Sequence, residues 1–301
     1  MTWQFTLTGF LIGALVGLTG MGGGSLMTPI LVIVFGFKPT YAVGTDILHG
    51  AIFKSFGAVR HRRLGTVKAK LAGWMFIGSG PLSLLGVWLA NWLSNNYGDG
   101  VQTAEGYAVG GALVAGAIGL AAKSLIRTKE RPPDWAFKLD RRGKILAILI
   151  GAVFGFVVGL TSVGSGTFFG LVMVLTYPLS ASAIVGTDIF HAAALLWVAG
   201  VGHLVSGNVD LHAMAWLLLG SIPGVLISSH YTLRVPDNVL RLGLACVLFL
   251  SGLKLLNVPQ ANWVLAGGLI AAAIAFSAWG LVARSSSAAA SRATAAPDTP
   301  L

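Results

Sequence analysis

Charged side chains are scarce in this chain, and this scarcity decides its structural class. Only 10% of the 301 residues are Asp, Glu, Lys or Arg, whereas 55% are hydrophobic and the mean hydropathy is +0.81. A soluble domain usually carries about 25% charged residues. The apolar residues form long runs separated by short charged loops, which indicates an all-α polytopic membrane protein.

Other missing features exclude further classes of protein. The single cysteine, Cys246, excludes an internal disulfide and points to a packing role. No Lys or Arg precedes Lys38, which argues against an N-terminal signal peptide. The sequence contains neither an ATPase phosphate-binding motif nor a nucleophile–base arrangement. We therefore expect no ATP-driven transport by this chain alone, no enzyme activity and no cofactor.

The positive net charge of +10 has a local origin. Twelve of the 20 Lys and Arg residues lie in two clusters between apolar segments, at 60–70 and 127–144. Clusters in such positions are orientation signals of membrane proteins. The expected partner is therefore a lipid bilayer, and no nucleic acid is expected.

Eleven apolar segments follow one another along the chain. They cover roughly 4–20, 25–37, 41–59, 71–93, 106–126, 145–162, 167–179, 183–205, 212–231, 239–256 and 262–282. The segments 25–37 and 167–179 reach only about 20 Å as helices, short of the roughly 30 Å hydrocarbon core. Each follows a break of small residues, G-M-G-G-G at 20–24 and S-V-G-S-G at 162–166. We expect broken or re-entrant helices at these two points.

The chain repeats itself at an offset of 142 residues. V-G-T-D-I-L-H at 43–49 returns as V-G-T-D-I-F-H at 185–191, and 24 of the 73 positions from 9 to 81 are identical at that offset. The duplication predicts two membrane repeats of about five apolar segments each. The predicted organisation is a first repeat at 1–127, a cytoplasmic linker at 128–144, a second repeat at 145–257, an extra transmembrane helix at 258–284 and a disordered tail at 285–301.

The distribution of basic residues predicts how the repeats are oriented. The basic loops 60–70 and 127–144 should both be cytoplasmic, and the acidic loop 94–105 should be outside. Loop 203–211, the copy of 61–69, has no Lys or Arg, and counting spans places it outside. The two repeats should therefore have inverted topology, as in many secondary transporters. The N-terminus is expected outside and the C-terminus in the cytoplasm.

Several motifs in this order resemble the TauE/SafE sulfite exporter family over roughly residues 5–256. They are G-L-T-G-M-G-G-G-S at 17–25, H-R-R-L-G-T-V at 61–67, G-N-V-D at 207–210 and G-S-I-P-G at 220–224. The resemblance implies export or uptake of a small sulfur-containing anion such as sulfite, thiosulfate or an organosulfonate. The second copy departs from the pattern because it replaces the glycine run by Gly164-Ser165-Gly166.

An anion is the expected occupant of the two breaks. Interrupted backbone exposes N–H groups at the start of a half-helix, where partial positive charge attracts an anion. Ser25 and Thr167 stand at the half-helix starts and could cap the helix or donate to a substrate oxygen. The alternative is that the small residues only allow close helix packing. The expected substrate-binding residues of the breaks are Thr19, Gly22, Gly23, Gly24, Ser25, Thr161, Gly164, Ser165, Gly166 and Thr167.

The long apolar segments contain two acidic residues, Asp46 and Asp188, each three positions before a histidine, His49 or His191. On a helix this spacing places both side chains on one face. A carboxylate in hydrocarbon is costly, so we predict that these pairs couple transport to protons. Two alternatives stay open: each Asp is tied to backbone N–H groups of the opposite repeat's break and only locks the fold, or the four groups bind a metal ion.

Three further residues complete the predicted site. Thr45 and Thr187 precede the two aspartates and could donate to the substrate. Lys54 is the only basic residue well inside an apolar segment, and its copy in the second repeat is Leu196. Lys54 could neutralise a bound anion, pair with Asp46, or extend to the membrane interface.

These observations predict a secondary transporter in the cytoplasmic (inner) membrane. Its expected substrate is a small sulfur-containing anion, and protons are the expected coupling partner. An anion channel and a metal-cation carrier that uses the Asp/His pairs are the alternatives.

Overall fold

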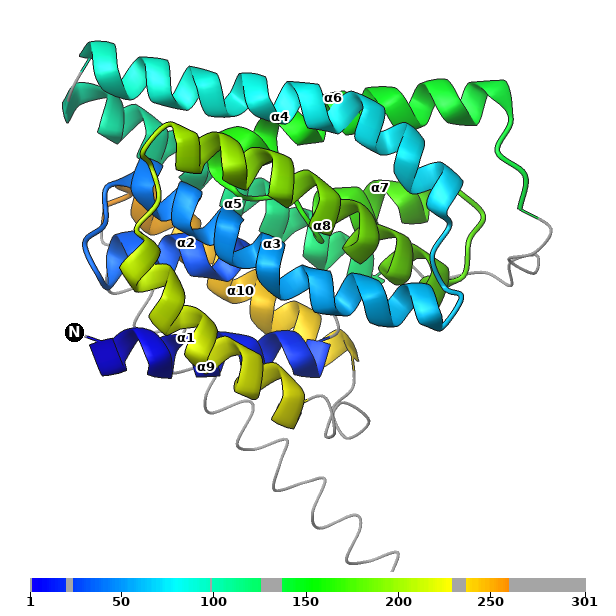
Figure 1. The fold of residues 1–301 in the computed structure, drawn as a ribbon, viewed down its shortest axis with the longest axis horizontal. Helices are drawn as coiled ribbons and strands as arrows, with labels where there is room; N and C mark the ends of the chain where they lie inside the picture. Colours follow the sequence, from blue (N-terminus) through cyan, green and yellow to red (C-terminus); the bar gives the residue numbers. More distant parts are fainter. Residues whose placement is uncertain (1, 20–23, 98, 126–136, 229–236, 260–301) are drawn as a thin grey trace, which may run out of the picture. The chain divides into compact units, whose positions relative to one another are not determined.

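The computed structural model describes residues 2–19, 24–97, 99–125, 137–228 and 237–259 (Figure 1). Within these ranges all regular secondary structure is helical. The helices are α1 Thr2–Thr19, α2 Gly24–Ile33, α3 Pro39–Arg63, α4 Ala69–Tyr97, α5 Asp99–Leu125, α6 Arg141–Thr161, α7 Phe168–Thr176, α8 Ala181–Val205, α9 Leu211–Ser228 and α10 Asp237–Leu255. The predicted segment 262–282 and the tail 285–301 lie outside the described residues.

The helices confirm the predicted class and the duplication. Helices α3 and α8 both have 25 residues and begin 142 positions apart, at Pro39 and Ala181. Helices α2 and α7 have only 10 and 9 residues, about 15 Å of helix, which is too short to cross a bilayer. By length and hydropathy, segments of α4, α5, α6 and α8 are each able to cross a membrane.

Local sequence sets where several of the helices begin. Pro39 occupies the first turn of α3 after an extended Lys38, where proline's fixed φ and missing N–H cost nothing. Asp140 caps α6 by accepting a hydrogen bond from Gly143 N at 2.7 Å. Ser180 caps α8 by accepting one from Ala183 N at 3.2 Å. Both caps satisfy an amide that has no partner within its helix.

The two repeats are interleaved around an approximate two-fold relation. Helix α4 packs against α6, and the equivalent pair in the other repeat is α9 against α1. Helices α3 and α8 pack against each other, as do α5 and α10, so each of these pairs joins a helix to its own copy. Figure 1 shows the α4/α6 and α1/α9 pairs on opposite sides of α3 and α8, which run in opposite directions.

Glycines bring the paired helices into backbone contact. A Cβ added at Gly151 of α6 would lie 2.0 Å from the carbonyl oxygen of Met75 in α4. The equivalent Cβ at Gly9 of α1 would lie 2.2 Å from the carbonyl oxygen of Leu217 in α9. Only glycine permits such an approach, which is the packing mode of small residues in membrane helices.

Each short helix folds back along the helix that precedes it. Tyr177, just after α7, donates from its hydroxyl to the carbonyl oxygen of Gly143 at the start of α6, at 2.9 Å. Burial and the nearby Asp140 carboxylate raise the pKa of Tyr177 to about 12, so the hydroxyl stays protonated and keeps donating. In the first repeat, Phe5 of α1 stacks on Phe35 after α2 at 4.5 Å between ring centroids. The second break is therefore the turn of a re-entrant hairpin, as the sequence predicts, whereas residues 20–23 of the first break lie outside the described residues.

Equivalent loops of the two repeats lie at opposite ends of the bundle. Lys68, in the α3–α4 loop, donates from its backbone N to Thr187 Oγ1 at 2.9 Å, near the start of α8. Asp210, in the α8–α9 loop, donates in the same way to Thr45 Oγ1 at 3.0 Å, near the start of α3. The first loop shares its end of the bundle with the start of α6, where Lys144 Nζ lies 5.4 Å from the ring centroid of Trp74 in α4. We call this the basic end.

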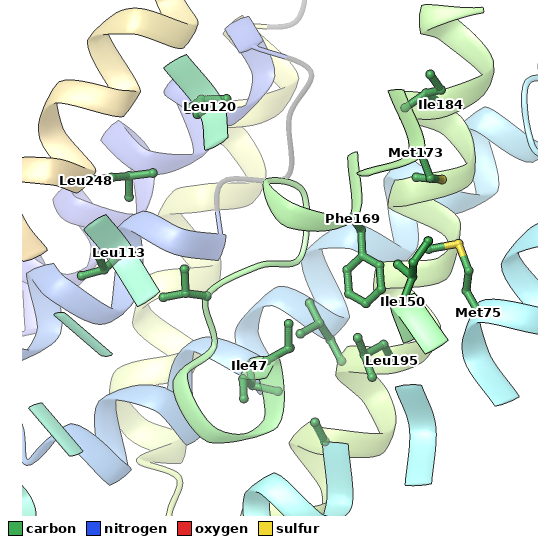
Figure 2. Close-up of a cluster of buried hydrophobic side chains, with 14 of the residues drawn as sticks. Ile47, Met75, Leu113, Leu120, Ile150, Phe169, Met173, Ile184, Leu195 and Leu248 are labelled. Atoms are coloured by element: carbon green, nitrogen blue, oxygen red, sulfur yellow. The ribbon is translucent and has the colours of Figure 1, made fainter. Parts of the chain in front are cut away.

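The main core joins helices from both repeats. Figure 2 shows Phe169 of α7 among Ile47 of α3, Ile150 of α6 and Leu195 of α8. Phe169, Ile47 and Leu195 are fully buried. The re-entrant helix α7 is thus fixed in place by side chains from the helices of the other repeat as well as its own.

The prediction of a loop at 94–105 is wrong at all its described positions, because helix α4 continues to Tyr97 and helix α5 begins at Asp99. Glu105 lies within α5 and is only 6% exposed. Thr40 Oγ1, in the first turn of α3, donates to Glu105 Oε2. The sequence analysis missed this helix turn because its acidic residues resemble a loop.

Candidate transport site at the second break

The break between α6 and α7 has an irregular backbone that depends on small residues. Ser162 ends α6 with φ 62°, and Gly164 and Gly166 have φ values of 125° and 105°. These values lie in the region that L-residues rarely adopt, which explains the two glycines. All residues from Ser162 to Thr167 are buried. The break is therefore an interior feature.

Amide N–H groups of the break fall into two sets. The first amides of α7 converge on the carbonyl oxygen of Gly164, with Thr167 N at 3.3 Å, Phe168 N at 3.2 Å and Phe169 N at 3.5 Å. In contrast, no described residue accepts a hydrogen bond from the N–H of Gly164, Ser165 or Gly166. Buried amides normally have a partner, and successive free amides in turn conformations bind anions. The amides open to a ligand therefore belong to residues 164–166.

The prediction that the Thr167 side chain caps α7 is wrong. It occupies the N-cap position with φ −101° and ψ −68°, and its side chain makes no capping hydrogen bond. Its Oγ1 is buried and has no hydrogen-bond partner among the described residues. A buried hydroxyl without a partner beside the free amides adds a donor that a ligand could use.

Asp46 of α3 is bound to both repeats. Its Oδ2 accepts hydrogen bonds from Thr28 N at 3.2 Å, Thr28 Oγ1 at 2.6 Å and Ser162 Oγ at 2.8 Å. Asp46 is 1% exposed, and its Oδ1 has no partner among the described residues. The bond to Ser162 agrees in part with the alternative that Asp46 holds the opposite break, although a hydroxyl rather than a backbone amide is the donor.

Lys54 of α3 points into the break and not to the membrane interface. Its Nζ donates to Ser165 O at 3.0 Å and to Ser165 Oγ at 2.8 Å, and the residue is 3% exposed. The structure therefore excludes the interfacial alternative and places a buried cation against the second break.

Two histidine–serine hydrogen bonds occupy equivalent positions in the two repeats. His49 Nε2 lies 2.9 Å from Ser221 Oγ, and His191 Nε2 lies 2.9 Å from Ser79 Oγ. Each bond joins a helix of one repeat to a helix of the other, and all four residues are buried. The His residues therefore lie one turn from the aspartates but bond to serines that the sequence analysis did not select.

Thr45 and Thr187 also form a matched pair, because each accepts the loop amide described above. Thr161 donates from Oγ1 to Val157 O at 2.7 Å and accepts from Val163 N at 3.2 Å. The hydroxyls of these three predicted substrate ligands thus already have partners within the protein. Their assignment to substrate stays a prediction.

The first break is described less completely. Gly22 and Gly23 lie outside the described residues, and only the backbone of Thr19, Gly24 and Ser25 is described. Their predicted role in binding therefore stays a prediction.

The polar contacts of the second break have no copies in the first repeat. Thr28 corresponds to Gly170, Ser162 to Gly20, and Lys54 to Leu196. Thr28 and Ser162 were missed by the sequence analysis, and a comparison of the two copies is the signal that would have found them. Within the part of the chain that the structure describes, no three His, Cys, Asp or Glu side chains come close enough to hold a metal ion.

Comparison with known proteins agrees with this architecture. The model of the sulfite exporter TauE/SafE family matches residues 5–255. Probable membrane transporter protein YjnA of Bacillus subtilis is 42% identical over 256 residues, which are 85% of this chain and 100% of that protein. Probable membrane transporter protein YdhB of Bacillus subtilis is 25% identical over 82% of this chain and 97% of its own length.

A more distant relative is the probable membrane transporter protein MJ0441 of Methanocaldococcus jannaschii. It is 26% identical over 83% of this chain and 93% of its own length. No solved structure matches this chain. The match across nearly all described helices, together with the duplicated re-entrant architecture, shows that the chain is a multi-pass membrane transporter of the TauE/SafE sulfite exporter family.

Proposed function

We propose that this transporter moves a small sulfur-containing anion, such as sulfite, thiosulfate or an organosulfonate, together with protons. The observation that carries the proposal is the position of Lys54, a buried cation whose Nζ is held at Ser165 beside three amides for which no described residue provides an acceptor. A cation, oriented N–H groups and the Thr167 hydroxyl together form a site for an oxyanion.

Protons enter the proposal because the anion would bind near two carboxylates. Asp46 hydrogen-bonds to Ser162 in the same break that Lys54 contacts, and the charge of Asp188 interacts with Lys54. An ionised carboxylate repels an anion strongly in a medium of low dielectric. Protonation of one carboxylate therefore accompanies binding, and the proton gradient drives the anion.

Purified protein in liposomes tests this proposal directly. Uptake of labelled sulfite is measured with and without an imposed pH gradient, in the wild type, in Asp46→Asn, in Asp188→Asn and in the double variant. The gradient should accelerate uptake, and only the double substitution should abolish that dependence, because one remaining aspartate can still take up the coupled proton. Unchanged dependence in the double variant would exclude these aspartates as proton carriers. Flux that fails to saturate and ignores the gradient would identify a channel instead.

The basic end should face the cytoplasm and the N-terminus the outside of the cytoplasmic (inner) membrane. Leu64 and Val205, at the ends of α3 and α8, are 64% and 83% exposed and suit labelling. In a Cys246→Ser background, Val205→Cys should react with an impermeant maleimide from outside. Leu64→Cys should react only after the membrane is opened. The reverse pattern would invert the orientation.

A further inference from the structure

Three ionisable side chains are buried where α3 packs against α8. Lys54, Asp46 and Asp188 are 3%, 1% and 5% exposed. Lys54 and Asp46 both hydrogen-bond to the second break, and Gly57 of α3 packs against Ile189, the residue after Asp188. We call these three residues the central triad. The groups that hydrogen-bond to Lys54 and Asp46, which are Thr28, Ser162 and Ser165, carry no charge.

The helices around the central triad bring no second charged group to it. Helices α1, α2, α7 and α9 contain no Asp, Glu, Lys or Arg. In α4, α5, α6 and α10 the charged residues lie within the first or last two turns. The remaining titratable side chains nearby are His49 of α3 and His191 of α8, whereas His61 and His203 lie in the last turns of these helices.

Both histidines are poor sites for an additional positive charge. His49 bonds to Ser221 and stacks on Phe53, at 5.9 Å between centroids. His191 bonds to Ser79, and a proton on its ring would place a second cation within electrostatic reach of Lys54. Neither ring has a carboxylate as a hydrogen-bond partner. The exchangeable protons of the centre therefore reside on Asp46 and Asp188.

Charges in a dry protein interior must nearly cancel, because an unpaired buried charge is expensive. The triad without substrate is neutral when Lys54 is charged and the two aspartates share one proton. A bound anion of charge −1 restores neutrality when one further proton arrives, so that both aspartates become carboxylic acids. One anion and one proton then leave together on the other side, and no net charge crosses the membrane.

We propose that the transporter carries its substrate as a monoanion with one proton, in electroneutral symport, and that it discriminates against dianions of similar shape. This inference rests on the proposed function and specifies the ionic form of its substrate. A dianion leaves one negative charge unbalanced after both aspartates are protonated. The cost of one charge at the centre of a membrane protein corresponds to about a 100-fold loss of affinity.

Two fixed ions of similar geometry make the test sharp. Methanesulfonate is a monoanion and sulfate a dianion throughout the working pH range. Uptake of labelled methanesulfonate into proteoliposomes is driven by an imposed pH gradient while a potassium gradient with valinomycin sets the membrane potential. Charge movement is recorded in parallel on a solid-supported membrane, and sulfate is titrated as a competitor.

The expected result is pH-driven uptake of methanesulfonate that produces no net current and whose rate does not change with membrane potential. Sulfate should bind about 100-fold more weakly than methanesulfonate in the competition. A net current during uptake, or competition by sulfate within tenfold of methanesulfonate, would overturn the inference while leaving the proposed anion transport intact. Absence of uptake of methanesulfonate, sulfite and thiosulfate would instead remove the proposed function itself, and this inference with it.

A double variant that replaces both aspartates tests the inference independently. In Asp46→Asn/Asp188→Asn the triad keeps only the charge of Lys54, so that a bound monoanion completes neutrality without a proton. Uptake should lose its dependence on the pH gradient and should acquire a net current. Asparagine matches aspartate in size, and its carbonyl can accept the bonds that Thr28 and Ser162 donate. If the folded double variant still couples uptake to protons without current, the triad is not the proton carrier.

Discussion

The matched histidine–serine bonds allow the contact between the two repeats to be tested by removing a single oxygen atom. Ser79→Ala removes the hydroxyl that partners His191 and leaves the rest of the contact unchanged, because Ser79 Cβ remains against α6. His191 is 1% exposed, and its Nδ1 has no hydrogen-bond partner among the described residues. The bond to Ser79 is therefore its only one within the described chain.

The expected cost follows from this geometry. A buried polar group that loses its last partner costs about 1–3 kcal/mol, and interhelical bonds in membranes are worth about 0.6–1.7 kcal/mol. We expect Ser79→Ala to lower the free energy of unfolding by about 1–2 kcal/mol. Ser221→Ala, which breaks the equivalent bond to His49, should cost a similar amount, within about 0.5 kcal/mol.

Unfolding of the purified protein by SDS, followed by tryptophan fluorescence, measures these differences. Ser83→Ala is the matched control, because Ser83 lies in the same helix and is equally buried, but it bonds only to the carbonyl of Gly80 one turn away. A double-mutant cycle with His191→Phe isolates the interaction. If Ser79→Ala costs no more than Ser83→Ala, the interhelical bond does not support the fold and the reasoning fails.

Three other perturbations address the helix contact, the cation and the hairpin. In the same SDS titration, Gly151→Ala should lower the free energy of unfolding by about 1–3 kcal/mol, because its Cβ meets a carbonyl oxygen of α4. The control Gly73→Ala has open space around its Cβ and should be neutral or stabilising by up to about 1 kcal/mol. Lys54→Met keeps the side-chain volume but removes the cation, so we expect sulfite uptake per folded, reconstituted protein to fall at least about tenfold. Tyr177→Phe loses the bond to the start of α6, which should lower the free energy of unfolding by about 1 kcal/mol relative to wild type. This difference should persist to about pH 10 and vanish as the pH rises through the Tyr177 pKa of about 12.

Sequence reasoning reached the architecture because the relevant signals are local or periodic. The duplication fixes which helices are equivalent, and the short segments after the small-residue breaks identify α2 and α7 as re-entrant. The positions of Asp46 and Lys54 follow from their rarity in apolar segments. None of these inferences needs knowledge of which helix packs against which.

The partners of those residues could not be read in the same way. Whether Lys54 reaches the interface or Ser165 depends on the rotation of α3 and on the depth of the second break, which are properties of the packed bundle. Thr28 and Ser162 look like ordinary small polar residues of membrane helices until the fold brings both to Asp46. Glu105 was misplaced because a buried carboxylate bonded to Thr40 has the same sequence signature as one in a loop.

The approximate symmetry of the fold makes the asymmetry of its chemistry informative. Pairs that hold the repeats together, such as Thr45 with Asp210 N and Thr187 with Lys68 N, occur in both copies at nearly the same distance. The side chains that contact the second break, Thr28, Ser162 and Lys54, have no polar copies, because the equivalent residues are Gly170, Gly20 and Leu196. A duplicated carrier needs matched contacts so that its two halves can exchange roles as the site opens to either side. A single substrate at the centre needs only one cation. The two copies therefore keep the matched packing pairs and differ at Lys54, as the proposed single monoanion site between two inverted repeats requires.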